Sequence, residues 1–172
     1  MDLSLSDQER FLTLLNTHRR SLLKVCWTYG LTSHDRDDLL QEIVSRLWSS
    51  FERYDPDREF ATWMYRVALN VAIDFYRKQR RRSRETSSLD DDEMATVALT
   101  TDSSDRVRQL EELRELIEQR GDSDRALLLL HLENRSHSEI GEILGISESN
   151  VGTRLSRLKK SLRRSARQCP GE

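Results

Sequence analysis

The 172-residue chain has few of the residues that interrupt helices or cross-link a fold. It contains six glycines, two prolines and two cysteines. Because glycine and proline are the strongest breakers of regular structure, their scarcity predicts a mostly helical protein. The cysteines, Cys26 and Cys169, stand far apart and form no Cys-x-x-Cys pair. This pattern argues against a disulfide framework and a zinc site, and it fits a reducing cytoplasm.

Long apolar runs are also lacking, since 36% of the residues are hydrophobic and 34% are charged. No stretch approaches the roughly 18–20 apolar residues that cross a bilayer, so we expect no membrane insertion. The N-terminal segment is acidic and lacks the charged-then-apolar pattern of a secretion signal. We therefore expect a cytoplasmic location.

Aromatic residues are absent from the second half of the chain. All eleven lie between Phe11 and Tyr76, so a later core must consist of aliphatic side chains. Two cores of different composition predict two small helical domains, at residues 1–82 and 105–168. Between them, residues 83–104 are rich in Ser, Thr and Asp, which predicts a flexible acidic and polar linker. The expected fold class is all-α.

Charge is segregated along the chain although the formal net charge is only −2. Residues 77–84 hold six Lys or Arg and no Asp or Glu, and residues 151–168 hold seven and none. Residues 85–118 hold three Lys or Arg against eleven Asp or Glu. The two basic blocks are candidate phosphate contacts, although a solvated surface would also account for each.

Two amphipathic helices are expected in the first domain, and the second runs into the first basic block. The first begins after a Thr32 cap and ends near Arg53, before a turn at Pro56. Its apolar face carries Leu40, Val44, Leu47 and Phe51, widened by Ile43 and Trp48. Its opposite, polar face carries Asp38, Gln41, Glu42 and Ser45.

The second helix should run from about Glu59 to Arg82. Its buried side is expected at or beside Trp63, Val67, Val71 and Phe75. A polar row leads into the basic block and comprises Arg66, Asn70, Asp74, Arg77, Arg80 and Arg81. Such amide and guanidinium groups can bind bases and phosphates, and nearby aromatic rings can stack on unpaired bases. Core packing is the alternative for Phe60 and Trp63, and a network of surface pairs is the alternative for the polar row.

The C-terminal half predicts helices at 105–119 and 122–133, followed by a helix-turn-helix. Ser136 or Ser138 can cap a short helix, Gly145 permits a tight turn, and Ser147 can cap a longer helix. The longer helix has an apolar row of Val151, Leu155, Leu158 and Leu162. Its outward face offers Ser149, Asn150, Thr153, Arg154, Arg157 and Lys160 for base edges and phosphates. A plain helical hairpin with a charged surface is the alternative.

Three strings resemble the extracytoplasmic-function (group 4) sigma factors of bacterial RNA polymerase, within the sigma-70 family. They are DDLLQEIVSRLW (37–48), FATWMYRVALNVAIDFYRKQRRR (60–82) and SEIGEILGISESNVGTRLSRLKKSLR (138–163). The resemblance implies a region 2-like helical bundle and a region 4-like helix-turn-helix. It departs from the usual family pattern at Gly141, Ser149-Asn150 and Gly152, so the −35 sequence should differ from the commonest one.

The resemblance also implies partners and site residues. Asp38, Gln41 and Glu42, with Ser45 on the same face, would contact the β′ clamp of core RNA polymerase, whose β flap is a further contact. The loop from Arg53 to Thr62, including Tyr54, and the nearby Asn70 would surround a base flipped from the −10 promoter element. Arg77 and the arginines after it would hold DNA, and Thr153, Arg154 and Arg157 would face the −35 element. An anti-sigma factor is a further expected partner.

Two other functions compete with a sigma factor. A free-standing helix-turn-helix regulator would bind duplex DNA without polymerase. An enzyme is the weaker alternative, because the four histidines are scattered and no nucleophile–base pair or phosphate loop is evident. A metal site built on Asp35, Asp37, Asp38 and Glu42 is less plausible than a solvated acidic face. We expect no catalytic residue, metal or cofactor.

Overall fold

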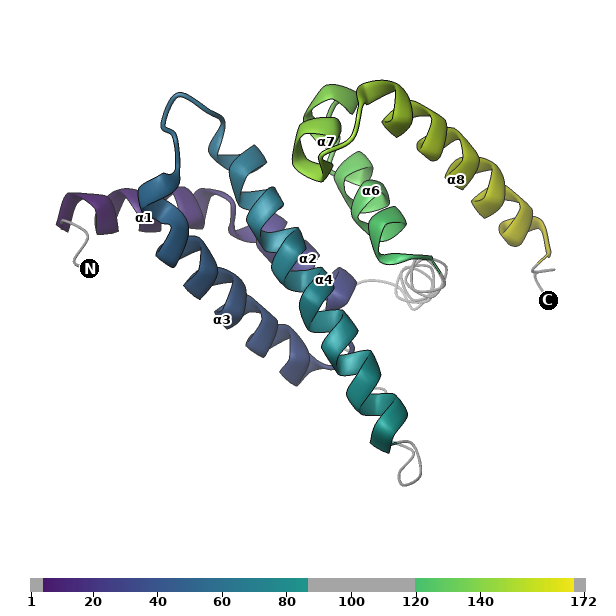
Figure 1. Ribbon diagram of the computed structural model, residues 1–172, viewed down its shortest axis with the longest axis horizontal. Coiled ribbons are helices and arrows are strands. Elements are labelled where there is room, and N and C mark those ends of the chain that lie inside the picture. Colours follow the sequence, from purple (N-terminus) through teal and green to yellow (C-terminus); the bar gives the residue numbers. More distant parts are fainter. Residues whose placement is uncertain (1–4, 87–119, 169–172) are drawn as a thin grey trace, which may run out of the picture. The chain divides into compact units, whose positions relative to one another are not determined.

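The computed structural model describes residues 5–86 and 120–168, which form helices joined by short turns and contain no strand. The chain divides into two compact units, at 1–98 and 99–172. The first unit contains α1 (Leu5–Thr17), α2 (Arg19–Tyr29), α3 (Ser33–Ser50), a short 3-10 turn (Phe51–Arg53) and α4 (Phe60–Thr86). The second contains α6 (Asp122–Leu132), α7 (His137–Leu144) and α8 (Glu148–Gln168). Figure 1 shows both sets of helices.

The expected all-α class is confirmed. α4 continues to Thr86, past residue 83 where the linker was expected to begin. The rest of that linker and the helix predicted at 105–119 lie outside the described residues. In the part of the chain that the structure describes, no helix is long and apolar enough to cross a membrane.

Local signals position α3 and α4. The Thr32 hydroxyl accepts a hydrogen bond from the Asp35 N–H at 3.0 Å, and Asp35 accepts one from the Thr32 N–H at 3.0 Å. This capping box satisfies N–H groups that the first turn leaves open. After α3, the Asp57 N–H donates to the Asp55 carboxylate at 3.0 Å, which fixes the predicted turn.

The core of the first unit lies between α2, α3 and α4. α3 contributes Leu39, Ile43 and Leu47, which have no exposed surface. The prediction for this helix was partly wrong: Leu40 and Val44 are only half-buried, one position away from the true centre of the stripe. The reason is that α3 packs against both α2 and α4, which rotates its buried face. α4 likewise buries Met64, Ala68 and Ala72, whereas Trp63, Val67 and Phe75 flank that stripe and Val71 is buried.

The second unit is a helix-turn-helix packed on α6, as the sequence predicts. α6 buries Ala126 to Leu130, and α8 buries Val151, Leu155 and Leu158. Ser136, rather than Ser138, caps α7, and Gly145 adopts the left-handed conformation with φ 68°. A Cβ on Gly141 would lie 2.7 Å from the Ile146 carbonyl oxygen, so the close crossing of α7 and the turn requires a residue without one.

Candidate functional site

The polar face of α3 is assembled as the sequence predicts. Asp38, Gln41, Glu42 and Ser45 are all exposed on that helix. The Asp38 carboxylate lies 3.5 Å from the His34 imidazole, one turn earlier, and both side chains remain largely solvated. The result is an exposed helix surface that bears carboxylate and amide groups.

An aromatic cluster surrounds the α3–α4 turn. Tyr54 stacks on Phe51 with ring centroids 5.8 Å apart, and it contacts Phe60 edge-on at 5.4 Å and Trp63 at 5.2 Å. Its hydroxyl donates to the Arg58 carbonyl oxygen at 2.7 Å, which holds the ring in place. Burial raises the pKa of Tyr54, and the nearby Arg10 opposes that rise.

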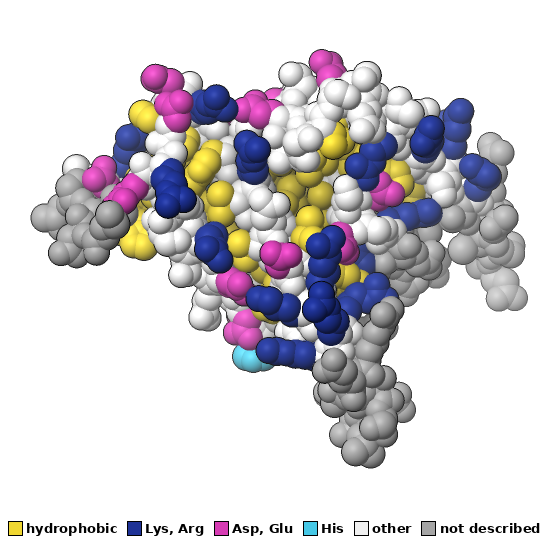
Figure 2. Space-filling model, viewed as in Figure 1, with side chains coloured by type: hydrophobic (Ala, Val, Ile, Leu, Met, Phe, Trp, Pro, Cys, Tyr) yellow, Lys and Arg dark blue, Asp and Glu magenta, His cyan; other side chains and the backbone are white. Residues whose placement is uncertain are grey.

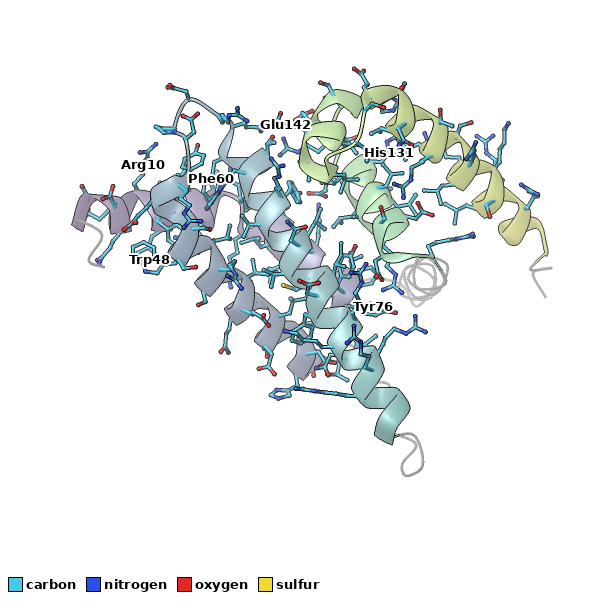
Figure 3. The ribbon with its side chains drawn as sticks, viewed as in Figure 1. Arg10, Trp48, Phe60, Tyr76, His131 and Glu142 are labelled. Carbon is cyan, nitrogen blue, oxygen red and sulfur yellow. The ribbon has the colours of Figure 1, made fainter. Side chains whose placement is uncertain are left out.

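Burial distinguishes the rings that pack in the core from those that could stack on an unpaired base. Phe60 is only 4% exposed, so it is a core residue and presents little ring surface to a base. Tyr54 and Trp63 are half-buried and keep part of each ring accessible. Sequence reasoning missed Arg10, which is labelled in Figure 3. Its guanidinium lies 5.9 Å from the Tyr54 ring centroid. No local signal links residue 10 to residue 54, because the contact joins α1 to the turn.

The polar row of α4 lies in solvent and leads into the basic block. Its members Arg66, Asn70, Asp74, Arg77, Arg80 and Arg81 are all exposed. Figure 2 shows Lys and Arg side chains gathered over the C-terminal part of α4. Arg80 lies 5.7 Å from the Tyr76 ring centroid, so its side chain is oriented by a cation–π contact. This surface can attract phosphates along its length.

Gln79 fixes the direction of this basic segment, and sequence reasoning missed its role. Its side-chain amide donates to Asp35 Oδ1 at 2.6 Å, while Asp35 Oδ2 serves the α3 cap. One carboxylate therefore closes the start of α3 and ties the C-terminal half of α4 to it.

The outward face of α8 carries five of the six predicted residues in exposed positions, namely Ser149, Asn150, Thr153, Arg157 and Lys160. The Ser147 hydroxyl accepts from the Asn150 N–H at 3.3 Å and caps the helix. The Thr153 hydroxyl donates to the Ser149 carbonyl oxygen at 2.9 Å, so its methyl group and the lone pairs of its oxygen remain for other contacts.

Arg154 departs from the predicted arrangement. It is half-buried, and its guanidinium binds Asp124 Oδ1 at 2.5 Å and the Ser123 hydroxyl at 3.0 Å, both on α6. The sequence predicts that the Arg154 guanidinium faces DNA, but in the structure it is paired with a carboxylate of the same domain. The physical reason is its angular position on α8, which faces the start of α6 rather than solvent.

Electrostatics around α8 are consistent with a positive surface. Partial burial lowers the pKa of His131, and the nearby Lys159 and His137 lower it further. His137 lies beside Gly152, where a Cβ would be 3.7 Å from its Nδ1 atom. Among the described residues, no cluster of His, Cys, Asp or Glu could hold a metal ion.

Comparisons with known proteins match both units. Residues 14–82 match the model of sigma-70 region 2, and residues 110–162 match that of sigma-70 region 4. The ECF RNA polymerase sigma factor SigW of Bacillus subtilis is 30% identical over 94% of this chain and 91% of its own length. SigX, an ECF RNA polymerase sigma factor of the same species, is 29% identical over 91% of this chain and 84% of its own length.

Two solved structures share the fold. CnrH, in complex with the cytosolic domain of CnrY, has a TM-score of 0.71 at 21% identity and covers 95% of this chain and 91% of its own. RpoE of Bartonella quintana, in complex with the anti-sigma factor NepR, has a TM-score of 0.67 at 17% identity and covers 95% and 98%. With both regions matched in order and SigW aligned along almost the whole length, the chain belongs to the sigma-70 family, in its extracytoplasmic-function group.

Proposed function

We propose that this protein is a promoter-specificity subunit of bacterial RNA polymerase, which binds core enzyme, recognises −10 and −35 elements and promotes DNA opening. The observation that carries the proposal is the ordered pair of region 2 and region 4 matches, together with alignment to SigW along 94% of the chain. The protein would carry no reaction of its own. Its part is to position DNA against an enzyme.

Three separate surfaces bind polymerase, the −10 element and the −35 element. The exposed row Asp38, Gln41, Glu42 and Ser45 binds the polymerase clamp. The half-buried Tyr54 and Trp63, with Asn70 and the arginines of α4, hold the separated strand at the −10 element, because exposed rings stack on unpaired bases. The outward face of α8, with Asn150 and Arg157, enters the major groove at the −35 element.

An inhibitory protein partner is part of the proposal. The two structural neighbours were solved in complex with CnrY and with the anti-sigma factor NepR, respectively. A partner that covers the acidic row of α3 would block core polymerase. Recovery of a protein that binds this chain and competes with core enzyme would support this, and inhibition that leaves core binding intact would contradict it.

The test of function is reconstitution. Purified full-length protein is mixed with core bacterial RNA polymerase and genomic DNA, and the 5′ ends of the transcripts are sequenced. We expect a stable complex and transcripts that start downstream of a shared pair of −10 and −35 sequences. Glu42→Lys should abolish complex formation, whereas Arg157→Ala should leave it intact and weaken −35 selection. A wild-type protein that shifts promoter DNA alone and forms no complex with core enzyme would be a free-standing regulator instead.

A further inference from the structure

The leading half of α8 offers little positive charge to DNA. Residues 148–153, all within the described part of the chain, include no Lys or Arg, and Glu148 adds a negative charge. The first cation of the helix is Arg154, which is bound to Asp124 and Ser123 on α6. In a helix-turn-helix this leading half enters the major groove, and the phosphates of both strands border that groove. A cation that binds phosphate there would have to come from another helix.

His137, the first residue of α7, lies beside Gly152 of α8. A Cβ on Gly152 would be 3.7 Å from His137 Nδ1 and 3.8 Å from His137 Cε1, which is an ordinary contact distance. The imidazole therefore lies against backbone that glycine leaves without a side chain. His137 is exposed, and Thr153, which follows Gly152, is exposed as well. The ring thus extends the outward face of α8 with a group from a different helix.

Further positive charge lies near His137. Burial lowers the pKa of His131 on α6, and the nearby Lys159 of α8 and His137 lower it further. Because such an effect requires the charged groups to be neighbours, His137 and Lys159 both lie close to His131. A polyanion that binds beside His137 would therefore be attracted by side chains of more than one helix.

We propose that His137 is a further DNA-binding residue, which donates a hydrogen bond to a backbone phosphate at the −35 element. The inference rests on the proposed function and extends it to a residue of α7. A neutral imidazole carries one N–H donor and a protonated imidazole carries two. The bond is charge-assisted because the phosphate oxygen is ionised. Contacts of this kind fix the register of a protein on the duplex and carry no base preference of their own.

Substitutions at position 137 test the contact in reconstituted holoenzyme bound to duplex promoter DNA. His137→Ala should weaken promoter binding about three- to tenfold, and by the same factor for promoters that differ in their −35 sequences. His137→Phe keeps a ring against Gly152 and removes the donors, so it should lose as much. His137→Lys supplies a new donor and should return the affinity to within about twofold of wild type.

Gly152 provides two matched controls. Gly152→Ala adds a Cβ that has room beside the imidazole. Promoter affinity should therefore stay within about twofold of wild type, while the thermal midpoint of the second unit rises. Gly152→Arg in the His137→Ala protein supplies a cation from α8 itself and should recover most of the lost affinity. Far-ultraviolet circular dichroism of each variant checks that the second unit remains folded.

The outcomes separate this contact from the function on which it rests. Wild-type holoenzyme that fails to bind the promoter would refute the proposed function itself. Wild-type binding with an unaffected His137→Ala variant would overturn only the role of His137. A His137→Phe variant that binds like wild type would show that the ring acts by packing, which contradicts the proposal. A loss confined to one −35 base pair also contradicts it, because His137 would then read a base rather than hold a phosphate.

Discussion

Arg154 and Arg157 stand one turn apart on α8 and should respond differently to the same substitution. Arg154 is paired with Asp124 and Ser123, with its side chain 26% exposed. Arg157 is exposed on the outward face. We expect Arg154→Ala to lower the stability of the second unit and Arg157→Ala to lower affinity for the −35 element.

The expected magnitudes follow from burial. An exposed ion pair contributes about 0–1 kcal/mol, whereas removal of one partner from a fully buried pair costs about 3–5 kcal/mol. The Arg154–Asp124 pair lies between these limits, at 26% and 35% side-chain exposure. Loss of either partner should therefore cost about 1–2 kcal/mol of unfolding free energy. Arg157→Ala should change it by less than about 0.5 kcal/mol and cost about 1–3 kcal/mol of discrimination at one promoter position.

The assay separates stability from recognition. All three tryptophans lie in the first unit, so fluorescence monitors that unit, while far-ultraviolet circular dichroism monitors both. Denaturation of Arg154→Ala, Asp124→Ala and the double variant gives the coupling energy of the pair. Binding of each variant holoenzyme to promoters with single −35 substitutions gives the free energy by which that variant discriminates between −35 sequences.

Two results together would refute the structural role of the pair. One is a coupling energy near zero between positions 124 and 154. The other is a loss of −35 discrimination in Arg154→Ala equal to that of Arg157→Ala, with stability unchanged. In that case Arg154 would act as the outward reader that the sequence alone predicts.

Three further predictions concern a helix cap, a turn and a hydrogen bond between helices that position the proposed binding surfaces. Hydrogen bonds from Ser136 and Arg135 lower the pKa of Glu139 to about 2, so its stabilisation is present above about pH 4.5 and is lost as the pH falls toward 2. Because the side chain is 33% exposed, we expect it to contribute about 1 kcal/mol to the free energy of unfolding. Glu139→Gln should therefore reduce the fall in unfolding free energy between pH 5 and pH 2. The same pH dependence in the variant and the wild type would contradict this. Gly145→Ala should cost about 1–2 kcal/mol, since φ is 68° there, and an unchanged thermal midpoint of the second unit would argue against a strained turn. Gln79→Ala should slow promoter opening while core affinity stays constant, as measured by open-complex kinetics, and equal losses of both would indicate general unfolding.

Local features of the fold could be predicted from the sequence because each depends on neighbouring residues. The Thr32 cap, the Gly145 turn and the Ser147 cap are all set within a few positions. The buried stripe of α3 was harder to predict, because Leu39 and Leu40 are equally apolar. Only the placement of α2 and α4 decides which of them is buried.

Parts of the candidate site depended on contacts between distant segments. The exposed rows of α3 and α4 follow from helical periodicity, so they could be predicted. The pairing of Arg154 with Asp124 spans thirty positions, and the contact of Arg10 with Tyr54 crosses from α1 to the turn. Charge and spacing within one helix carry no information about such partners, so the sequence alone did not predict that Arg154 pairs with Asp124.

The bond between Gln79 and Asp35 has a mechanical consequence. α3 carries the surface proposed for polymerase, and α4 carries the surface proposed for the separated strand. A carboxylate that closes one helix and holds the other leaves little freedom between them. The two surfaces are therefore held in a fixed relative position. The entropy cost of ordering them arises during folding rather than when the protein binds the promoter. Once polymerase binds α3, the distance from the clamp to the unpaired bases is already set.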